Sequence, residues 1–265
     1  MIVDAHQHFW QVGRFDYPWM TSDLGILDRD YLPSESRTAD QIVVVQASNS
    51  VAESRWLLEL ADENSFIAGV VGWVDLTSAD NQLAELTRHA KFKGVRHLVE
   101  SEPADDWLVQ PAVIAGLQRL SEFGLSYDLL VHTRHLRYVK TVAEKCPDLR
   151  LVIDHLAKPP IAKHGFEEWA REFTPLASYP NMYCKLSGLV TEAEWSSWTT
   201  DDLRPYVEYA MELFGPRRLM FGSDHPVCLL AATYERVLQS FQEIVGDEHS
   251  DLIFRENART FYRLD

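Results

Sequence analysis

Eight short runs of apolar and β-branched residues alternate with amphipathic stretches along the 265 residues of this chain, and this alternation limits the fold more than any other feature. The runs predict β-strands at Ile2–His8, Ile42–Gln46, Ile67–Trp73, Gly94–Leu98, Ser126–Val131, Leu151–Asp154, Met182–Lys185 and Leu219–Phe221. The stretches between and after them predict helices at Ala52–Asn64, Ala79–His89, Ala112–Phe123, Leu136–Glu144, Phe166–Ala177, Asp202–Phe214, Thr233–Val245 and Asp251–Tyr262. Alternating strands and helices predict a parallel sheet, and eight such units predict closure into a single (β/α)8 TIM barrel over residues 1–265.

An open, doubly wound sheet is the structural alternative. Such sheets usually bind nucleotides through a glycine-rich loop, and neither G-x-G-x-x-G nor G-x-x-x-x-G-K-[ST] follows a predicted strand. The segment from about residue 9 to residue 40 departs from the alternation, because it is rich in aromatic residues and too long for a simple barrel connection. We expect it to lie at the mouth of the barrel, either as a lid over a ligand or packed on the rim.

The composition argues against several classes of partner. The chain carries 40 acidic and 25 basic residues, a formal net charge of −15, which repels nucleic-acid phosphates and anionic lipids. No apolar run approaches the roughly 20 residues of a membrane span.

The cysteines Cys146, Cys184 and Cys228 lack metal-type spacing, and the chain opens on Ile2 and Val3 without a leader pattern, so we expect a cytoplasmic location. The sequence is compatible with a homo-oligomer as well as with a monomer.

Polar side chains stand where the predicted strands end. In a barrel of this kind the carboxyl ends of all strands meet at one face, and the active site is built there. The residues at these ends are His6, His8, Gln46, Trp73, Arg96, His97, His132, His155, Lys185 and Asp224. A face that needed only packing would not require imidazoles at four strand ends together with a carboxylate and a lysine, so we expect a functional site there.

The first strand ends in a His-x-His pair, His6 and His8. Residues i and i+2 of a strand point to the same side, so the two imidazoles project side by side. Buried imidazoles need partners, which indicates a metal ion, a proton-transfer site or a bound substrate. His155 and Asp224 end two later strands in the same way, although a core histidine and a helix N-cap would explain each of them singly.

His-x-His on the first strand, histidine on the sixth and aspartate on the eighth together resemble the amidohydrolase superfamily. Further motifs resemble its lactone-hydrolysing branch, which includes L-fuconolactone and L-rhamnonolactone hydrolases and 2-pyrone-4,6-dicarboxylate lactonases. These motifs are Asp4–Trp10, Asp16–Trp19, Arg29–Pro33, Lys185–Leu189 and Phe221–Cys228. The similarity covers nearly the whole chain and is greatest to the L-fucono-1,5-lactone hydrolases.

The resemblance implies a hydrolase that opens a small sugar-acid lactone to the free aldonic acid by attack of water on the ester carbonyl. It implies catalytic roles for four residues, with the aspartate as general base and then general acid: His6, His8, His155 and Asp224. Other polar strand-end residues are expected to contact the lactone: Gln46, Trp73, Arg96, His97, His132 and Lys185. A metal-dependent decarboxylase and a 2-pyrone-4,6-dicarboxylate-type lactonase are alternatives within the superfamily. A non-catalytic barrel that binds a sugar acid or a metal is a third.

Metal binding is a separate question. The donor types of His6, His8, His155 and Asp224 suit one divalent ion, zinc first, and His132 is a further candidate ligand. Two-metal members carry a lysine at the end of the fourth strand, where this chain has Arg96 and His97, so a bridged pair of metals is not expected. Reaction without a metal is the alternative, because ligand-type residues specify a site and not its occupancy. A serine nucleophile is not expected, since no G-x-S-x-G motif is present.

Overall fold

The computed structural model describes residues 1–35 and 37–265. Eight parallel strands form one sheet in sequence order: β1 Val3–Gln7, β2 Gln41–Val45, β3 Ile67–Gly72, β4 Phe92–Leu98, β5 Ser126–Leu130, β6 Arg150–Ile153, β7 Met182–Leu186 and β8 Leu219–Phe221. The sheet closes beyond the short β8, where the Asp224 amide donates to the His6 carbonyl and the His8 amide donates to the His225 carbonyl, both at 2.8 Å. The predicted (β/α)8 barrel is confirmed.

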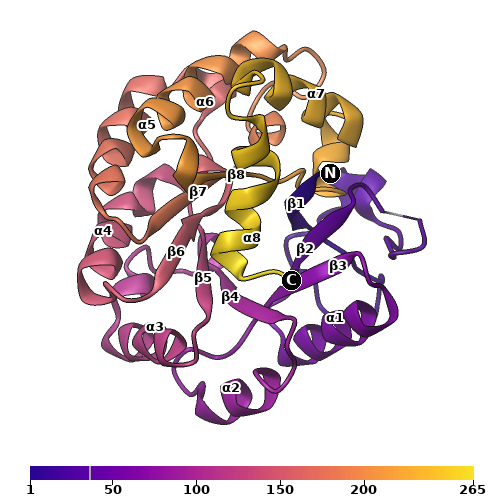
Figure 1. Cartoon of the computed structure of the whole chain (residues 1–265), viewed down its shortest axis with the longest axis vertical. Coiled ribbons are helices and arrows are strands. Elements are labelled where there is room, and N and C mark those ends of the chain that lie inside the picture. Colours follow the sequence, from indigo (N-terminus) through magenta and orange to yellow (C-terminus); the bar gives the residue numbers. More distant parts are fainter. Residues whose placement is uncertain (36) are drawn as a thin grey trace.

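Helices surround the barrel (Figure 1): α1 Val51–Glu63, α2 Asp80–Leu86, α3 Pro111–Glu122, α4 Leu136–Lys145, α5 Phe166–Phe173, α6 Thr200–Phe214, α7 Tyr234–Val245 and α8 Asn257–Tyr262. The predicted helix at Phe166–Ala177 is wrong in its second half, where the chain turns into a 3₁₀ helix at Thr174–Ser178. Pro175 explains the change, because it cannot donate an α-helical hydrogen bond. The last predicted helix also divides, into a π-helix at Leu252–Glu256 and α8. Among the helices of the described residues, none has both the length and the apolar character to cross a membrane.

Two apolar cores stabilise the barrel. The larger fills the space between the outer faces of the strands and the helices, as Leu129 of β5 and Leu117 of α3 illustrate. The smaller lies inside the barrel and includes Val43 and Met220 together with Phe261 of α8. Helix α8 therefore covers the end of the barrel at which the strands begin (Figure 1), which leaves the opposite end for a pocket.

The aromatic-rich segment packs at that opposite end. Trp10, Tyr17, Leu27 and Tyr31 form a buried cluster of their own, and partly buried Trp19 packs against it. The Trp19 indole donates to the Ala47 carbonyl just after β2, at 2.7 Å. The segment is therefore anchored to the rim, and Trp19 is the part of it that reaches the pocket described below.

Candidate active site

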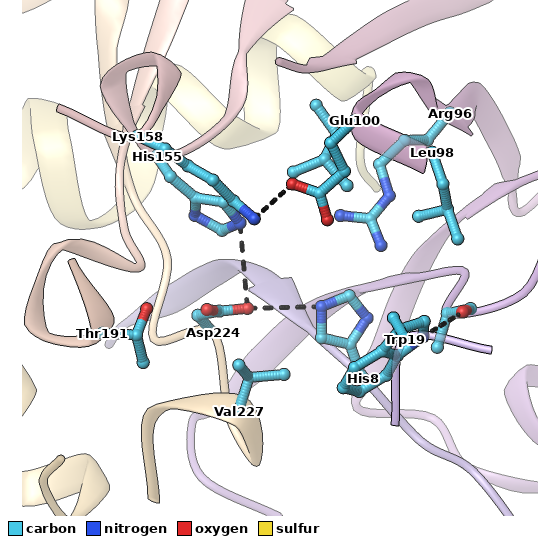
Figure 2. Close-up of a pocket in the computed structure, with 12 residues that line it drawn as sticks. His8, Trp19, Arg96, Leu98, Glu100, His155, Lys158, Thr191, Asp224 and Val227 are labelled. Atoms are coloured by element: carbon cyan, nitrogen blue, oxygen red, sulfur yellow. Dashed lines mark hydrogen bonds and ion pairs between the residues drawn. The ribbon is translucent and has the colours of Figure 1, made fainter. Parts of the chain in front are cut away.

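A pocket opens at the carboxyl ends of the strands (Figure 2). Its wall combines histidines, both signs of charge and apolar side chains: His8, Trp19, Ala47, Arg96, Leu98, Glu100, Leu130, His155, Lys158, Thr191, Asp224 and Val227. Four residues singled out in the sequence line it, namely His8, Arg96, His155 and Asp224. They come from the residue after β1, from β4, from the turn after β6 and from the chain after β8, so closure of the barrel is what brings them together.

Asp224 faces the histidines. Its Oδ1 atom lies 3.3 Å from His8 Nε2, 3.7 Å from His6 Nε2 and 3.9 Å from His155 Nε2. The Asp224 backbone has a left-handed φ of 59°, and its amide is fixed to the His6 carbonyl, so the carboxylate is held against the end of β1. His6, His8 and His155 therefore lie close to Asp224 in the structure, as the sequence predicted.

The protonation states in this cluster suit a base. Burial lowers the pKa of His8 and also that of His155, so both imidazoles are neutral at neutral pH. Burial opposes ionisation of Asp224, but at the acidic pH where this carboxyl titrates the facing histidines carry protons, and His155 and His8 then outweigh burial and lower the pKa of the carboxyl. Asp224 is therefore an ionised carboxylate that can accept a proton.

The cluster fits one divalent cation. His8 Nδ1 lies 2.7 Å from the Val45 carbonyl and so carries the proton, which leaves the Nε2 lone pair directed at the cluster. The Nε2 atoms of His6 and His8 are 3.1 Å apart, and these two nitrogens and an Asp224 oxygen lie close enough together to share an ion. Two imidazoles and a carboxylate are a common donor set for a catalytic zinc.

His155 is oriented by its neighbours in the fold. Its Nδ1 atom lies 2.8 Å from Ser187 Oγ. Gly188 lies against the ring, where an added Cβ would come within 2.4 Å of His155 Nδ1, and its φ of +62° also favours glycine. The residues after β7 therefore fix the direction in which His155 Nε2 points.

A sealed network of charges lies beneath the pocket. Lys185 Nζ contacts Asp128 Oδ2 at 2.6 Å, Asp154 Oδ1 at 3.0 Å and His6 Nδ1 at 3.1 Å. The Tyr262 hydroxyl of α8 donates to Asp128 Oδ2 at 2.7 Å. Lys185 is 0% exposed and does not line the pocket, so its position suits a supporting role better than the expected contact with substrate.

Arg96 connects this network to the pocket. Its Nη1 atom lies 3.3 Å from Asp154 Oδ2 and 3.2 Å from His6 Nε2, and its Nη2 atom donates to the Gln46 carbonyl. Arg96 is thus held by the sealed network. It still reaches the pocket wall.

The other expected substrate contacts lie outside the pocket lining. His97 is enclosed, because Trp73 Nε1 donates to its Nδ1 at 2.9 Å and Glu102 Oε1 lies 2.7 Å from its Nε2. Gln46 donates to the Arg96 carbonyl at 3.2 Å. His132 contacts the pocket only indirectly, through Glu100 Oε2 at 3.5 Å.

Sequence reasoning missed several lining residues, and Lys158 is the most telling. Four consecutive residues without a glycine, His155 to Lys158, have left-handed φ values of 55°, 49°, 63° and 50°. This conformation costs L-residues roughly 1–2 kcal/mol each, and nothing in the residue types predicts it. The turn places Lys158 in the pocket beside His155 and opposite Glu100, which follows β4 (Figure 2). The weak signal in the sequence was a lysine three residues after a strand-end histidine.

Comparison with known proteins identifies the family of this chain. The family model described as amidohydrolase matches residues 3–264. The chain belongs to the amidohydrolase family. An L-fucono-1,5-lactonase from Burkholderia ambifaria is 40% identical over 280 residues, which span 99% of this amidohydrolase and 96% of the relative. An L-rhamnono-gamma-lactonase from Scheffersomyces stipitis is 29% identical over 57% of the chain and 50% of its own length.

A solved crystal structure has the same fold over the entire length of this chain. The crystal structure of a Burkholderia multivorans amidohydrolase with bound zinc superposes with a TM-score of 0.92 and 34% identity, and covers 100% of both chains. At this level of similarity the fold and the family of this amidohydrolase are both established.

Proposed function

We propose that this amidohydrolase hydrolyses a sugar-acid lactone, with L-fucono-1,5-lactone as the first substrate to test. The observation that carries the proposal is the full-length similarity to the Burkholderia ambifaria lactonase. The pocket supports it chemically, because an ionised carboxylate, Asp224, lies beside neutral imidazoles in an open pocket with both polar and apolar walls.

Asp224 is the proposed general base. It accepts a proton from the attacking water as the water oxygen bonds to the lactone carbonyl carbon. When the ring ester bond breaks, the protonated Asp224 returns that proton to the departing ring oxygen, and the product is the open aldonic acid. The same carboxyl group therefore serves both proton transfers, and no covalent enzyme intermediate forms.

Polarisation of the carbonyl is the second requirement. His155 and the Arg96 guanidinium line the same pocket as Asp224, and we propose that they donate hydrogen bonds to the carbonyl oxygen as negative charge develops on it. His6, His8 and Asp224 would hold one divalent ion, for which we propose zinc. Such an ion, when bound, polarises a carbonyl oxygen and lowers the pKa of a water molecule.

The test is a pH-indicator assay over L- and D-aldonolactones and 2-pyrone-4,6-dicarboxylate, with and without a chelator. We expect proton release with a hydroxylated aldonolactone and little with the dicarboxylate. Release of carbon dioxide would instead favour a decarboxylase, and binding of lactones without turnover would favour a non-catalytic barrel. Loss of activity with chelator and its return with zinc would support the metal, whereas unchanged activity would favour hydrolysis without one.

We further propose that the protein acts in the cytoplasm on a small molecule. Its three cysteines, Cys146, Cys184 and Cys228, are free and buried, which suits a reducing compartment. The net charge of −15 makes nucleic acid and anionic lipid unsuitable partners.

A further inference from the structure

An ion pair in the pocket wall is not used by the proposed chemistry. Lys158 Nζ and Glu100 Oε2 lie 2.5 Å apart, and each side chain is 20% exposed. Figure 2 shows the ammonium and the carboxylate turned toward each other at the edge of the pocket that holds Asp224. Both groups are therefore at hand for a ligand in that pocket, while neither is within the Asp224 cluster.

The fold maintains this pair at a cost. Lys158 reaches the pocket only through the left-handed turn that begins at His155. A mostly buried ion pair also loses hydration, and apolar residues of similar size often stabilise a protein equally well. Unfavourable backbone geometry of this kind concentrates at functional sites, so the arrangement calls for a ligand that uses both charges.

We propose that the Glu100–Lys158 ion pair binds the ring hydroxyls of the lactone and determines its specificity. Each hydroxyl can both donate and accept a hydrogen bond. Adjacent hydroxyls on a sugar ring can therefore donate to the Glu100 carboxylate and accept from the Lys158 ammonium, while the carbonyl faces Asp224. This inference rests on the proposed lactonase function and names the substrate class: a neutral, polyhydroxylated lactone.

The charges of the pocket disfavour lactones that carry carboxylates. The basic side chains among the described lining residues are Arg96 and Lys158. Arg96 already faces the Asp154 carboxylate, and Lys158 already faces the Glu100 carboxylate. An additional carboxylate on the ring would add a negative charge to a wall that already carries Glu100 and Asp224, and neither basic side chain of the lining lacks a carboxylate partner. A carboxylated ring such as a pyrone dicarboxylate is accordingly a poor ligand.

The test compares two lactones of the same ring size, L-fucono-1,5-lactone and δ-valerolactone, which lacks the hydroxyls. The measured quantity is the ratio of their kcat/KM values in the wild type, Glu100→Gln and Lys158→Met. Loss of a hydrogen bond to a charged group predicts a fall in this ratio of about tenfold or more in each variant. Glu102→Gln is the matched control, because Glu102 pairs with His97 outside the pocket and should leave the ratio unchanged.

A ratio that stays at the wild-type value in both variants, or equal losses on the two lactones, would overturn the inference. Circular dichroism and thermal melts establish that the variants are folded. If the wild type hydrolyses neither lactone, the proposed function fails, and calorimetric binding of L-fucose still tests the pair. In that case we expect measurable binding to the wild type that weakens about tenfold in Glu100→Gln, and equal binding would reject the pair as a hydroxyl site.

Discussion

The barrel contains two layers of charged and imidazole groups, and they differ in depth rather than in residue type. The upper layer, His8, His155 and Asp224, lines an open pocket. The lower layer, centred on Lys185 between Asp128 and Asp154, is sealed from solvent. The comparison shows that a polar residue near a strand end can either meet the substrate or hold the residues that do.

The two layers also differ in the way their charges are stabilised. In the lower layer burial raises the pKa of Asp128 to about 6, although the adjacent Lys185 ammonium opposes this change. Burial and the positive charge of Lys185 together hold the pKa of His6 well below its ordinary value. The lower layer thus keeps His6 neutral beneath the pocket. Changes in the upper layer should affect turnover, and changes in the lower layer should affect folding.

The largest effect is expected from Asp224→Asn. This substitution keeps the shape of the side chain and removes the proposed base, so kcat/KM for the lactone should fall by roughly 10²–10⁴. The melting temperature should change little. Asp201→Asn, at an exposed carboxylate on α6, is the control and should keep full activity. An Asp224→Asn enzyme with wild-type turnover would contradict the role of Asp224.

Lys185→Met should show the opposite pattern. It leaves the buried carboxyl groups of Asp128 and Asp154 without their ammonium partner, and breaking such a pair costs about 3–5 kcal/mol of unfolding free energy. Urea denaturation measures this loss. Lys140→Met, at an exposed position of α4, should leave stability almost unchanged. Equal stability of the two variants would mean that the lower layer is not structurally required.

Gly188→Ala tests how the upper layer is oriented. The added Cβ would collide with the His155 ring, and displacing a group in the active site by about 1 Å can cost 10²-fold in rate. Gly215→Ala is a control for positive φ without a clash, because Gly215 has φ +65° and no atom lies within 4 Å of the new Cβ; thermal melts establish that both variants are folded. We expect a large fall in kcat for the first variant alone. Similar kinetics for both variants would exclude His155 from the reaction.

The smallest effect concerns the rim, where Glu53 Oε2 accepts from the Ala47 and Ser48 amides at 3.1 and 2.9 Å. Burial raises the pKa of Glu53 from 4.5 to about 8. The folded state then binds more protons than the unfolded state between these values, so this group's contribution to stability falls as pH rises from 4.5 to 8. Unfolding free energies of Glu53→Gln should depend less on pH in that window. A parallel pH dependence in both proteins would show that Glu53 has an ordinary pKa.

Much of the fold was predictable because hydrophobic periodicity is a local property of the sequence. All eight strands were found, and the ends of β6 differ by a single residue from those predicted. Interruptions of helices were harder to place. Pro175 in the predicted Phe166–Ala177 helix was a signal that the prediction did not use, and the π-helix at Leu252–Glu256 has no such signal.

The candidate site was predictable only in part. The spacing of His6 and His8 and the strand-end positions of His155 and Asp224 indicated a common face, and the structure brings these residues together. The depth at which each side chain lies in the barrel was not predictable, because it depends on how the strands are staggered in the closed barrel. For this reason Lys185 was expected to contact the substrate, although it lies below the pocket. Lys158 was missed because its position depends on a left-handed turn formed without glycine.

The most direct test of the central claim is hydrolysis of L-fucono-1,5-lactone in H₂¹⁸O, followed by mass spectrometry of the product. Attack of water on the carbonyl, with Asp224 as base, predicts one ¹⁸O atom in the carboxylate of the aldonic acid, formed far faster with the wild type than with Asp224→Asn. Equal rates of labelled product for the two proteins, or release of carbon dioxide in place of an aldonic acid, would contradict the account.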